Sequence, residues 1–496
     1  DTDPPSVPTG LAASAVSSTS IELSWSASTD DAGVAGYRVY RDGSEVAYVT
    51  GTQHADTGLS PSTTYAYTVT AEDAAGNVSA PSAPAVATTD AGPGPGPGGA
   101  LTVDPANRRW LFYEDGRPYF LAGAGGPEDF LYRGDLQPDG TRSGGDQASI
   151  IDAMAAAGVN GLYVMAVRSH GGDGGATHNP WIGSDPANGL DQDILDQWEG
   201  WFSSLDAAGI TIYFVFYDDG TDPFGGRFGG GGDEGAFIAA LVDRFKHHDH
   251  LIWVIAEEYS EGLTDARALE IAATIAAHDP VHPRAIHLLP GTTFPFSGAD
   301  IQQFAIQATD NGIAALHATV LDAWENAAGG YNLNMSELNN ALGHANHSTA
   351  QIRQFNWASA LAGAYVMVHR WWESAGETPS AAELAQLGYL RAFMESARFD
   401  LMEPADARAA GDTEWVLAQR PGLGNDHLIG YGRAAVAGLG FTGLDPATYD
   451  LTWLDTETGQ TVSTQATVPA AGSFTFPRPA SLTGGELALY ARKAGL

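Results

Sequence analysis

The stretch Leu251-Ile252-Trp253-Val254-Ile255-Ala256-Glu257-Glu258 is a continuous apolar run that ends in two acids. Farther along the chain, Asn332-Leu333-Asn334-Met335-Ser336-Glu337 is a second short run that also ends in an acid. Strands that are buried on both faces of a parallel sheet read as continuous apolar runs. Acids at the carboxyl ends of such strands lie at the catalytic face of a (β/α)8 barrel. The two stretches therefore predict barrel strands whose carboxylates meet at one end.

Working outward from these stretches, residues 101–402 alternate between apolar runs and helical periodicity, which predicts a (β/α)8 TIM barrel. Eight strands are expected, at 119–123, 161–167, 210–217, 251–256, 285–289, 304–307, 332–335 and 365–369. Helices are expected at 149–157, 194–207, 235–246, 312–327 and 349–363. The barrel is thus predicted to be the central part of a multidomain chain.

The two ends of the chain have β character. Residues 1–89 show short alternating strands separated by turns, and they resemble a fibronectin type III β-sandwich. The positions that carry this resemblance are Trp25, Tyr37, Leu59, Pro61, Tyr65 and Tyr67. Residues 90–100 hold a Gly-Pro repeat that cannot form helix or sheet and predicts a linker. Residues 403–496 return to short strands, which predicts a C-terminal β-sandwich.

The composition excludes several kinds of partner. With a net charge of −37, the chain lacks the clustered Lys and Arg that nucleic acids and anionic membranes require. The acid excess fits a saline or marine source, and also a GC-rich genome. No apolar run reaches 18 residues, so no transmembrane helix is expected. There is no cysteine, which excludes disulfides and thiolate chemistry. The Pro-rich start fits a secreted protein whose leader has been removed.

Two carboxylates facing one cavity are the minimum equipment for cutting a glycosidic bond. One acid protonates the leaving oxygen, and it must stay protonated near neutral pH. The second acts as a nucleophile when the two groups lie about 5–5.5 Å apart, and activates a water when they lie about 6.5–9.5 Å apart.

The positions of these acids resemble those in a known clan of enzymes. An acid closing strand four and another closing strand seven are the arrangement of the clan A retaining glycoside hydrolases. The run 251–258, the run 334–337 and the run 352–364 resemble the apiosidase-like branch of that clan. Its C-terminal β domain is often described as collagen-binding-like. The resemblance implies that Glu258 is the general acid/base and that Glu337 is the nucleophile.

The sequence departs from the clan at Glu257, where the clan usually has an Asn that contacts the 2-hydroxyl of the substrate. A carboxylate accepts hydrogen bonds but donates none unless it is protonated. Its charge would also raise the proton affinity of Glu258. Either the substrate differs at its 2-position, or the roles of Glu257 and Glu258 are exchanged.

Other polar and aromatic residues at predicted strand ends are expected to bind substrate, because strand ends line the cleft of this fold. In the resemblance an Arg at the end of strand two keeps the nucleophile ionised, and a Trp after strand eight stacks on a sugar. The substrate-binding candidates are Glu257, Arg168, His170, Tyr217, Asp218, His287, Gln307, His369, Trp371 and Trp372.

No cofactor or catalytic metal is expected, and structural calcium at Asp-rich loops such as 135–146 or 185–193 stays open. The run His247-His248-Asp249-His250 invites a metal interpretation, but it leads into strand four at the barrel end opposite the predicted site. The prediction is a secreted, monomeric, retaining glycoside hydrolase acting on a polysaccharide or its oligosaccharides. Two alternatives stay open: a polysaccharide lyase, and a noncatalytic carbohydrate-binding or adhesion protein on a disabled barrel.

Overall fold

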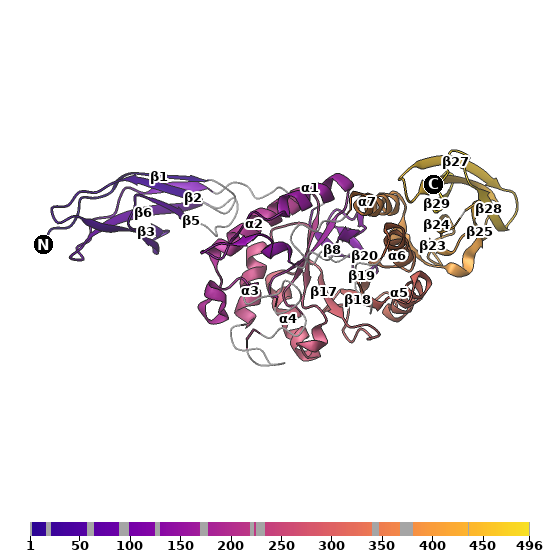
Figure 1. Cartoon of the computed structure of the whole chain (residues 1–496), viewed down its shortest axis with the longest axis horizontal. Coiled ribbons are helices and arrows are strands. Elements are labelled where there is room, and N and C mark those ends of the chain that lie inside the picture. Colours follow the sequence, from indigo (N-terminus) through magenta and orange to yellow (C-terminus); the bar gives the residue numbers. More distant parts are fainter. Residues whose placement is uncertain are drawn as a thin grey trace. The chain divides into compact units, whose positions relative to one another are not determined.

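The computed structural model describes residues 2–15, 21–56, 64–88, 99–124, 129–168, 177–218, 223–224, 234–339, 347–367, 380–434 and 436–495. The chain divides into two compact units (Figure 1). One unit comprises residues 1–94 with 192–199, and the other comprises residues 95–191 with 200–496. No helix in the described part of the chain is long and apolar enough to cross a membrane.

The N-terminal unit contains the predicted β-sandwich. One sheet has the order β1-β2-β5 and the other the order β4-β3-β6-β7. The strands are β1 (Thr9–Ala15), β2 (Ile21–Ser26), β3 (Val34–Arg41), β4 (Ser44–Val49), β5 (Gln53–Asp56), β6 (Thr64–Asp73) and β7 (Ala85–Thr88). Strict alternation in β2 places Ile21, Leu23 and Trp25 in the core. Tyr37 and Tyr67 are buried beside them, while Leu59 and Pro61 lie outside the described residues.

Eight parallel strands in sequential order form the barrel of the second unit. They are β11 (Gly123–Ala124), β14 (Gly161–Met165), β15 (Thr211–Val215), β16 (Leu251–Val254), β17 (Arg284–Leu288), β18 (Gln303–Thr309), β19 (Asn332–Asn339) and β20 (Tyr365–Val366). A parallel bridge between Ala122 and Val366 joins the first strand to the last. The predicted (β/α)8 architecture is therefore present.

The first predicted strand is only partly correct. Residues 118–119 form β10 (Pro118–Tyr119), which pairs antiparallel with β9 (Leu111–Tyr113) in a small sheet that also contains β8 (Leu101–Val103). The barrel strand begins only at Gly123, where a Cβ would meet the carbonyl oxygen of Gly161 at 2.8 Å. The close approach of these two backbones requires glycine at this position.

Helices alternate with the barrel strands. They are α1 (Gln147–Ala157), α2 (Gln192–Ala207), α3 (Glu234–Phe245), α4 (Asp265–His278), α5 (Ile313–Ala327), α6 (Thr349–Leu361) and α7 (Ala381–Ser396). Helices α4 and α7 were not among the predicted elements, although Thr264 and Ser380 cap their first turns. Residues 289–302, between β17 and β18, contain no helix. A cavity of about 300 Å³ lies beside this segment, lined in part by Phe294, Ile306 and Tyr331.

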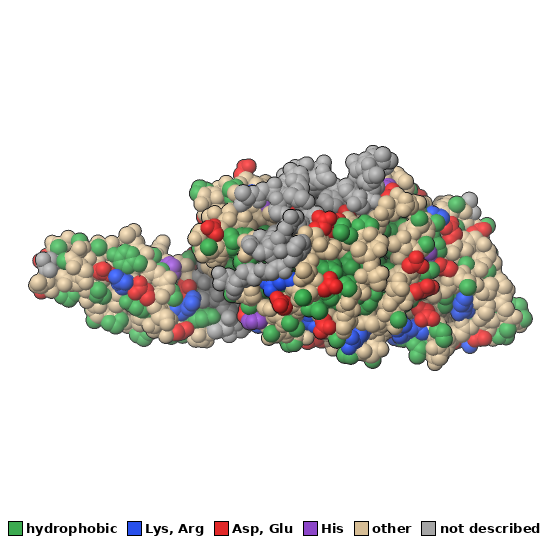
Figure 2. Space-filling view, turned by 90° about the horizontal axis from the view of Figure 1, so that it is seen from below, with side chains coloured by type: hydrophobic (Ala, Val, Ile, Leu, Met, Phe, Trp, Pro, Cys, Tyr) green, Lys and Arg blue, Asp and Glu red, His purple; other side chains and the backbone are tan. Residues whose placement is uncertain are grey.

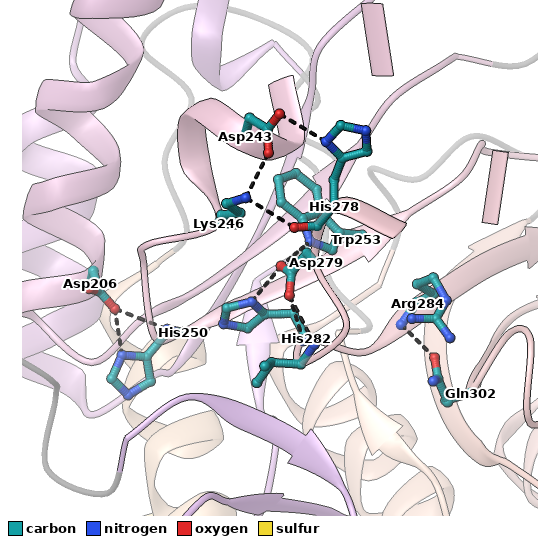
Figure 3. Close-up of polar contacts among 11 residues, drawn as sticks. Asp206, Asp243, Lys246, His250, Trp253, His278, Asp279, His282, Arg284 and Gln302 are labelled. Carbon is teal, nitrogen blue, oxygen red and sulfur yellow. Dashed lines mark hydrogen bonds and ion pairs between the residues drawn. The ribbon is translucent and has the colours of Figure 1, made fainter. Parts of the chain in front are cut away.

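Buried polar contacts fix the amino ends of β16 and β17 (Figure 3). Asp206 Oδ1 contacts His250 Nδ1 at 2.7 Å, just before β16 begins. Asp279 accepts hydrogen bonds from Trp253 Nε1 at 2.8 Å and from the backbone N–H of His282 at 3.2 Å. Burial raises the pKa of Asp279, but hydrogen bonds from His282 and Trp253 outweigh it and bring the pKa down to about 2. These contacts hold the strands whose opposite ends carry the candidate site.

The C-terminal strands form the predicted sandwich. The order of one sheet is β21-β23-β24-β29-β26-β27, and that of the other is β22-β25-β28. The strands are β21 (Met402–Pro404), β22 (Ala409–Gly411), β23 (Trp415–Gln419), β24 (His427–Gly432), β25 (Gly438–Leu444), β26 (Ala447–Asp455), β27 (Thr461–Val468), β28 (Gly472–Pro477) and β29 (Leu487–Lys493).

Helix α6 packs against this sandwich. Trp357 stacks on Tyr431 with ring centroids 5.1 Å apart. Arg353 Nη2 lies 2.6 Å from Glu486 Oε2, and both side chains are only 6% exposed. Because α6 directly precedes β20, the sandwich and the barrel share a buried polar contact.

Candidate active site

Glu257 and Glu258 follow strand β16 and turn the chain sharply at the carboxyl end of the barrel. The backbone N–H of Glu257 donates to the carbonyl oxygen of Tyr217, which continues the pairing of the two strands beyond the end of β15. Glu258 then adopts a left-handed conformation, with φ 37° and ψ 45°. This conformation is uncommon for a residue with a side chain and is typical of sites where surrounding contacts hold the backbone in place. The side chain of Glu258 is partly exposed, whereas Glu257 is 7% exposed.

Glu337 is placed by an irregularity in β19. Ile306 pairs with Met335, but Gln307 pairs with Glu337, so Ser336 is an extra residue in the ladder. A β-bulge of this kind changes the direction in which the following side chains point. Asn334 donates to Ser336 Oγ at 3.1 Å, so these two side chains lie together. Glu337 thereby comes to lie beside His287 rather than alternating away from it.

His287, on β17, lies between the two carboxylate segments. Its Nε2 is 3.8 Å from Glu337 Oε2, and its Nδ1 is 3.9 Å from Glu257 Oε1. One oxygen of Glu257, one ring nitrogen of His287 and one oxygen of Glu337 lie within 4.8 Å of one another. His287 has no exposed surface, and this burial lowers the pKa of its ring to about 3. The imidazole is therefore neutral near neutral pH.

Glu258 is linked to the same cluster through Gln307. Gln307 Nε2 donates to Glu258 Oε1. Gln307 is also the register partner of Glu337 on the neighbouring strand, so it connects the Glu258 carboxylate to the strand that carries Glu337. The ends of β16, β17, β18 and β19 thus bring Glu257, Glu258, His287, Gln307 and Glu337 together.

Tyr163 is a member of this cluster that the sequence analysis missed. Its hydroxyl donates to Glu257 Oε1 at 3.1 Å from within β14. The signal was a single hydroxyl in the apolar run 161–167, because a buried hydroxyl needs a hydrogen-bond partner. The contact leaves Glu257 anchored in the barrel interior rather than directed into solvent.

The described candidates that follow β14 and β15 are also buried. Arg168 Nε lies 3.8 Å from Asp218 Oδ2, and the two side chains are 4% and 2% exposed. Tyr217, which directly precedes Asp218 in the chain, is 1% exposed. The remaining candidates, His170, His369, Trp371 and Trp372, lie outside the described residues.

The cluster of Glu257, His287 and Glu337 has the residue types that a divalent cation can use. However, the backbone N–H of Glu258 donates to His287 Nδ1, at 3.4 Å. Nδ1 then carries the lone pair and Nε2 the proton, so the nitrogen that faces Glu337 is a donor rather than a ligand. We therefore treat the cluster as an acid–base site.

The N-terminal sandwich matches a known protein family. Residues 6–88 match the fibronectin type III domain family. Chitinase Chi52 of Paenibacillus xylanexedens is 55% identical over 111 residues, which are 22% of this chain and 20% of that protein. Exoglucanase B of Cellulomonas fimi is 59% identical over 93 residues, which are 19% of this chain and 8% of that protein. The chain thus spans a fifth or less of the length of these relatives.

Solved structures resemble a larger part of the chain. One that is named a glycoside hydrolase has a TM-score of 0.60 at 17% identity, covering 81% of this chain and 98% of that one. A glycoside hydrolase family 5 structure from Bacteroides vulgatus has a TM-score of 0.59 at 17% identity, covering 81% of this chain and 94% of that one. At this level of identity, the likeness shows that the chain shares their fold.

Proposed function

We propose that this protein is a retaining glycoside hydrolase that cleaves a polysaccharide or its oligosaccharides, with Glu258 as the general acid/base and Glu337 as the nucleophile. One observation supports this most: Gln307 binds the Glu258 carboxylate and is the register partner of Glu337 on the neighbouring strand. The fold that the chain shares with solved glycoside hydrolases agrees with it.

The role proposed for each Glu follows from the exposure of its side chain and from its hydrogen bonds. An acid that protonates a leaving oxygen has to reach the substrate, and Glu258 is the more exposed of the two neighbouring acids. Glu257 is buried and bound to Tyr163, so it is better suited to hold the site together. Glu337 attacks the anomeric carbon while Glu258 protonates the departing oxygen. Glu258 then removes a proton from water, which releases the sugar with retained configuration.

The charge of the surface indicates which class of glycan the protein binds. Acidic side chains are spread over the visible face of the molecule rather than gathered in one patch (Figure 2). Such a surface disfavours polyanionic chains, so we propose a neutral or sparsely charged glycan.

We further propose that the protein is secreted and monomeric, with a sandwich at 1–89, a linker at 90–100, the barrel at 101–402 and the second sandwich at 403–496. The C-terminal part is assigned to the collagen-binding-like domain of the apiosidase-like branch.

The experiment is a panel of neutral and charged polysaccharides scored for new reducing ends. Glu258→Gln and Glu337→Gln should each lower the rate about 10²- to 10³-fold, the usual scale for losing an acid–base group. Proton NMR of the first product should show the anomer of the substrate. Glu257→Gln is the matched control, because it changes the neighbouring carboxylate by the same atoms.

Three outcomes separate the alternatives. A larger loss in Glu257→Gln than in Glu258→Gln would exchange the roles of these two residues. Unsaturated products absorbing in the near ultraviolet would indicate a lyase. Full activity in both Glu258→Gln and Glu337→Gln would refute the assignment.

A further inference from the structure

His287 has a place in the cluster that differs from that of a substrate-binding side chain. It has no exposed surface, and both of its ring nitrogens face groups of the proposed catalytic apparatus. Nδ1 faces the backbone N–H of Glu258, and Nε2 faces the carboxylate of Glu337. The ring therefore lies between the two proposed catalytic residues.

The hydrogen-bond pattern defines the tautomer. A backbone N–H can only donate, so Nδ1 must accept from Glu258 and cannot carry a proton in the neutral ring. The proton then lies on Nε2, which makes no hydrogen bond within the described residues and is directed at Glu337 Oε2 at 3.8 Å. A buried donor without an acceptor is costly, so a shift of less than about 1 Å toward Glu337 would be favourable. Catalytic hydrogen bonds are often long before substrate binds and shorten afterwards.

The same ring also supports the backbone of Glu258. That residue has φ 37°, a strained conformation that persists only where neighbouring groups hold it. The hydrogen bond to His287 Nδ1 comes from the amide nitrogen of the strained residue itself. Losing this acceptor would let the turn relax, and the carboxylate would move with it.

We propose that His287 is a positioning residue that acts on both proposed catalytic groups at once. Its Nδ1 holds the left-handed turn that presents Glu258, and its Nε2–H orients the Glu337 carboxylate for attack. This inference rests on the proposed function, and it goes further by assigning to a buried residue the alignment of acid and nucleophile. The burial that keeps the ring neutral supports it, because an imidazolium could not accept from Glu258.

The first test needs no substrate. Imidazole ¹⁵N NMR of the full-length protein, assigned by comparison with His287→Gln, reports which ring nitrogen carries the proton. We expect a neutral ring with the proton on Nε2 from pH 5 to pH 8. A proton on Nδ1, or a charged ring at pH 6, would overturn the proposal.

The second test compares two substitutions by kinetics on the best substrate of the polysaccharide panel. Gln offers an acceptor oxygen and a donor NH2 group in place of the acceptor and donor nitrogens of neutral His, whereas Phe keeps the ring volume and offers neither. We expect His287→Phe to lower kcat about 100-fold with little change in KM, since a misplacement of about 1 Å costs that much. His287→Gln should recover at least about tenfold of this loss at an equal melting temperature.

The outcomes are distinguishable from those of the proposed function. If wild-type protein releases reducing ends and depends on Glu258 and Glu337, but His287→Phe keeps full kcat, only the positioning role fails. If Gln and Phe reduce kcat equally, His287 has a packing role alone and the inference is refuted. If wild-type protein releases no reducing ends from any glycan, the proposed function fails while the NMR result still reports the tautomer.

Discussion

Acid should destabilise this protein through His287 in a way that a single substitution can isolate. In the unfolded chain a His titrates near 6.5, whereas burial lowers the pKa of His287 to about 3 in the folded state. Between these values the unfolded state binds one more proton than the folded state. Stability therefore falls as pH decreases from about 6.5 to about 3.

The loss of stability follows from the size of the pKa shift of His287. Each pH unit below 6.5 costs about 1.4 kcal/mol, so the loss is about 2 kcal/mol at pH 5 and about 5 kcal/mol at pH 3. Gln cannot titrate, so His287→Gln should lack this contribution. Other titrating groups are common to both proteins and cancel in the difference, apart from those in contact with residue 287.

The assay is unfolding by guanidinium chloride of wild type and His287→Gln at pH 7, 6 and 5, followed by tryptophan fluorescence. The wild type should lose about 2 kcal/mol more than the variant between pH 7 and pH 5. Equal losses in the two proteins would refute the reasoning. In that case the carboxylates of Glu257 and Glu337, 3.8–3.9 Å away, would be holding the imidazolium in place against the cost of burial.

Two further predictions concern stability. Glu486→Ala should lower the free energy of unfolding in guanidinium by about 3–5 kcal/mol, because it leaves the buried Arg353 without its partner. The double variant Arg353→Met with Glu486→Leu should lower it far less. A loss below about 1 kcal/mol in Glu486→Ala would contradict this. Gly388→Ala should destabilise α7 by about 1–3 kcal/mol or more, because its Cβ would lie 1.8 Å from the carbonyl oxygen of Ala157. Gly200→Ala in α2 is the control, because its Cβ would meet no atom within 4 Å, and it should be neutral or stabilising by up to about 1 kcal/mol. Similar unfolding midpoints for Gly388→Ala and Gly200→Ala would show that the close contact at Gly388 is absent.

The order of the barrel strands could be predicted because parallel strands buried on both faces leave a simple signature. The run 251–256 contains no polar residue, and β16 lies within it with every residue buried. The predicted first strand at 119–123 was only partly correct, because the same apolar signature describes a buried hairpin and a barrel strand equally well. Backbone pairing, which periodicity does not report, decides between them.

The positions of the acids could be predicted, but their orientation could not. An alternating strand would direct Ser336 and Glu337 to opposite faces. The inserted residue at Ser336 changes that rule, and no local residue type signals a bulge there. The left-handed conformation of Glu258 was equally hidden, because glycine usually occupies such positions. Both departures from regular geometry lie at the candidate site, where strain held by surrounding contacts is expected.

The contacts of Glu257 also bear on the open question of which neighbouring acid reaches the substrate. The sequence alone left the two acids exchangeable. In the structure, Tyr163 donates to the buried Glu257, whereas Glu258 has a left-handed backbone and a partly exposed side chain. If Glu257 were the general acid, its protonated form would have to leave Tyr163 to reach a leaving oxygen. Glu258 is already partly exposed, and its carboxylate accepts a hydrogen bond from Gln307, the register partner of Glu337. The turn that strains the backbone is therefore the feature that makes the two acids unequal.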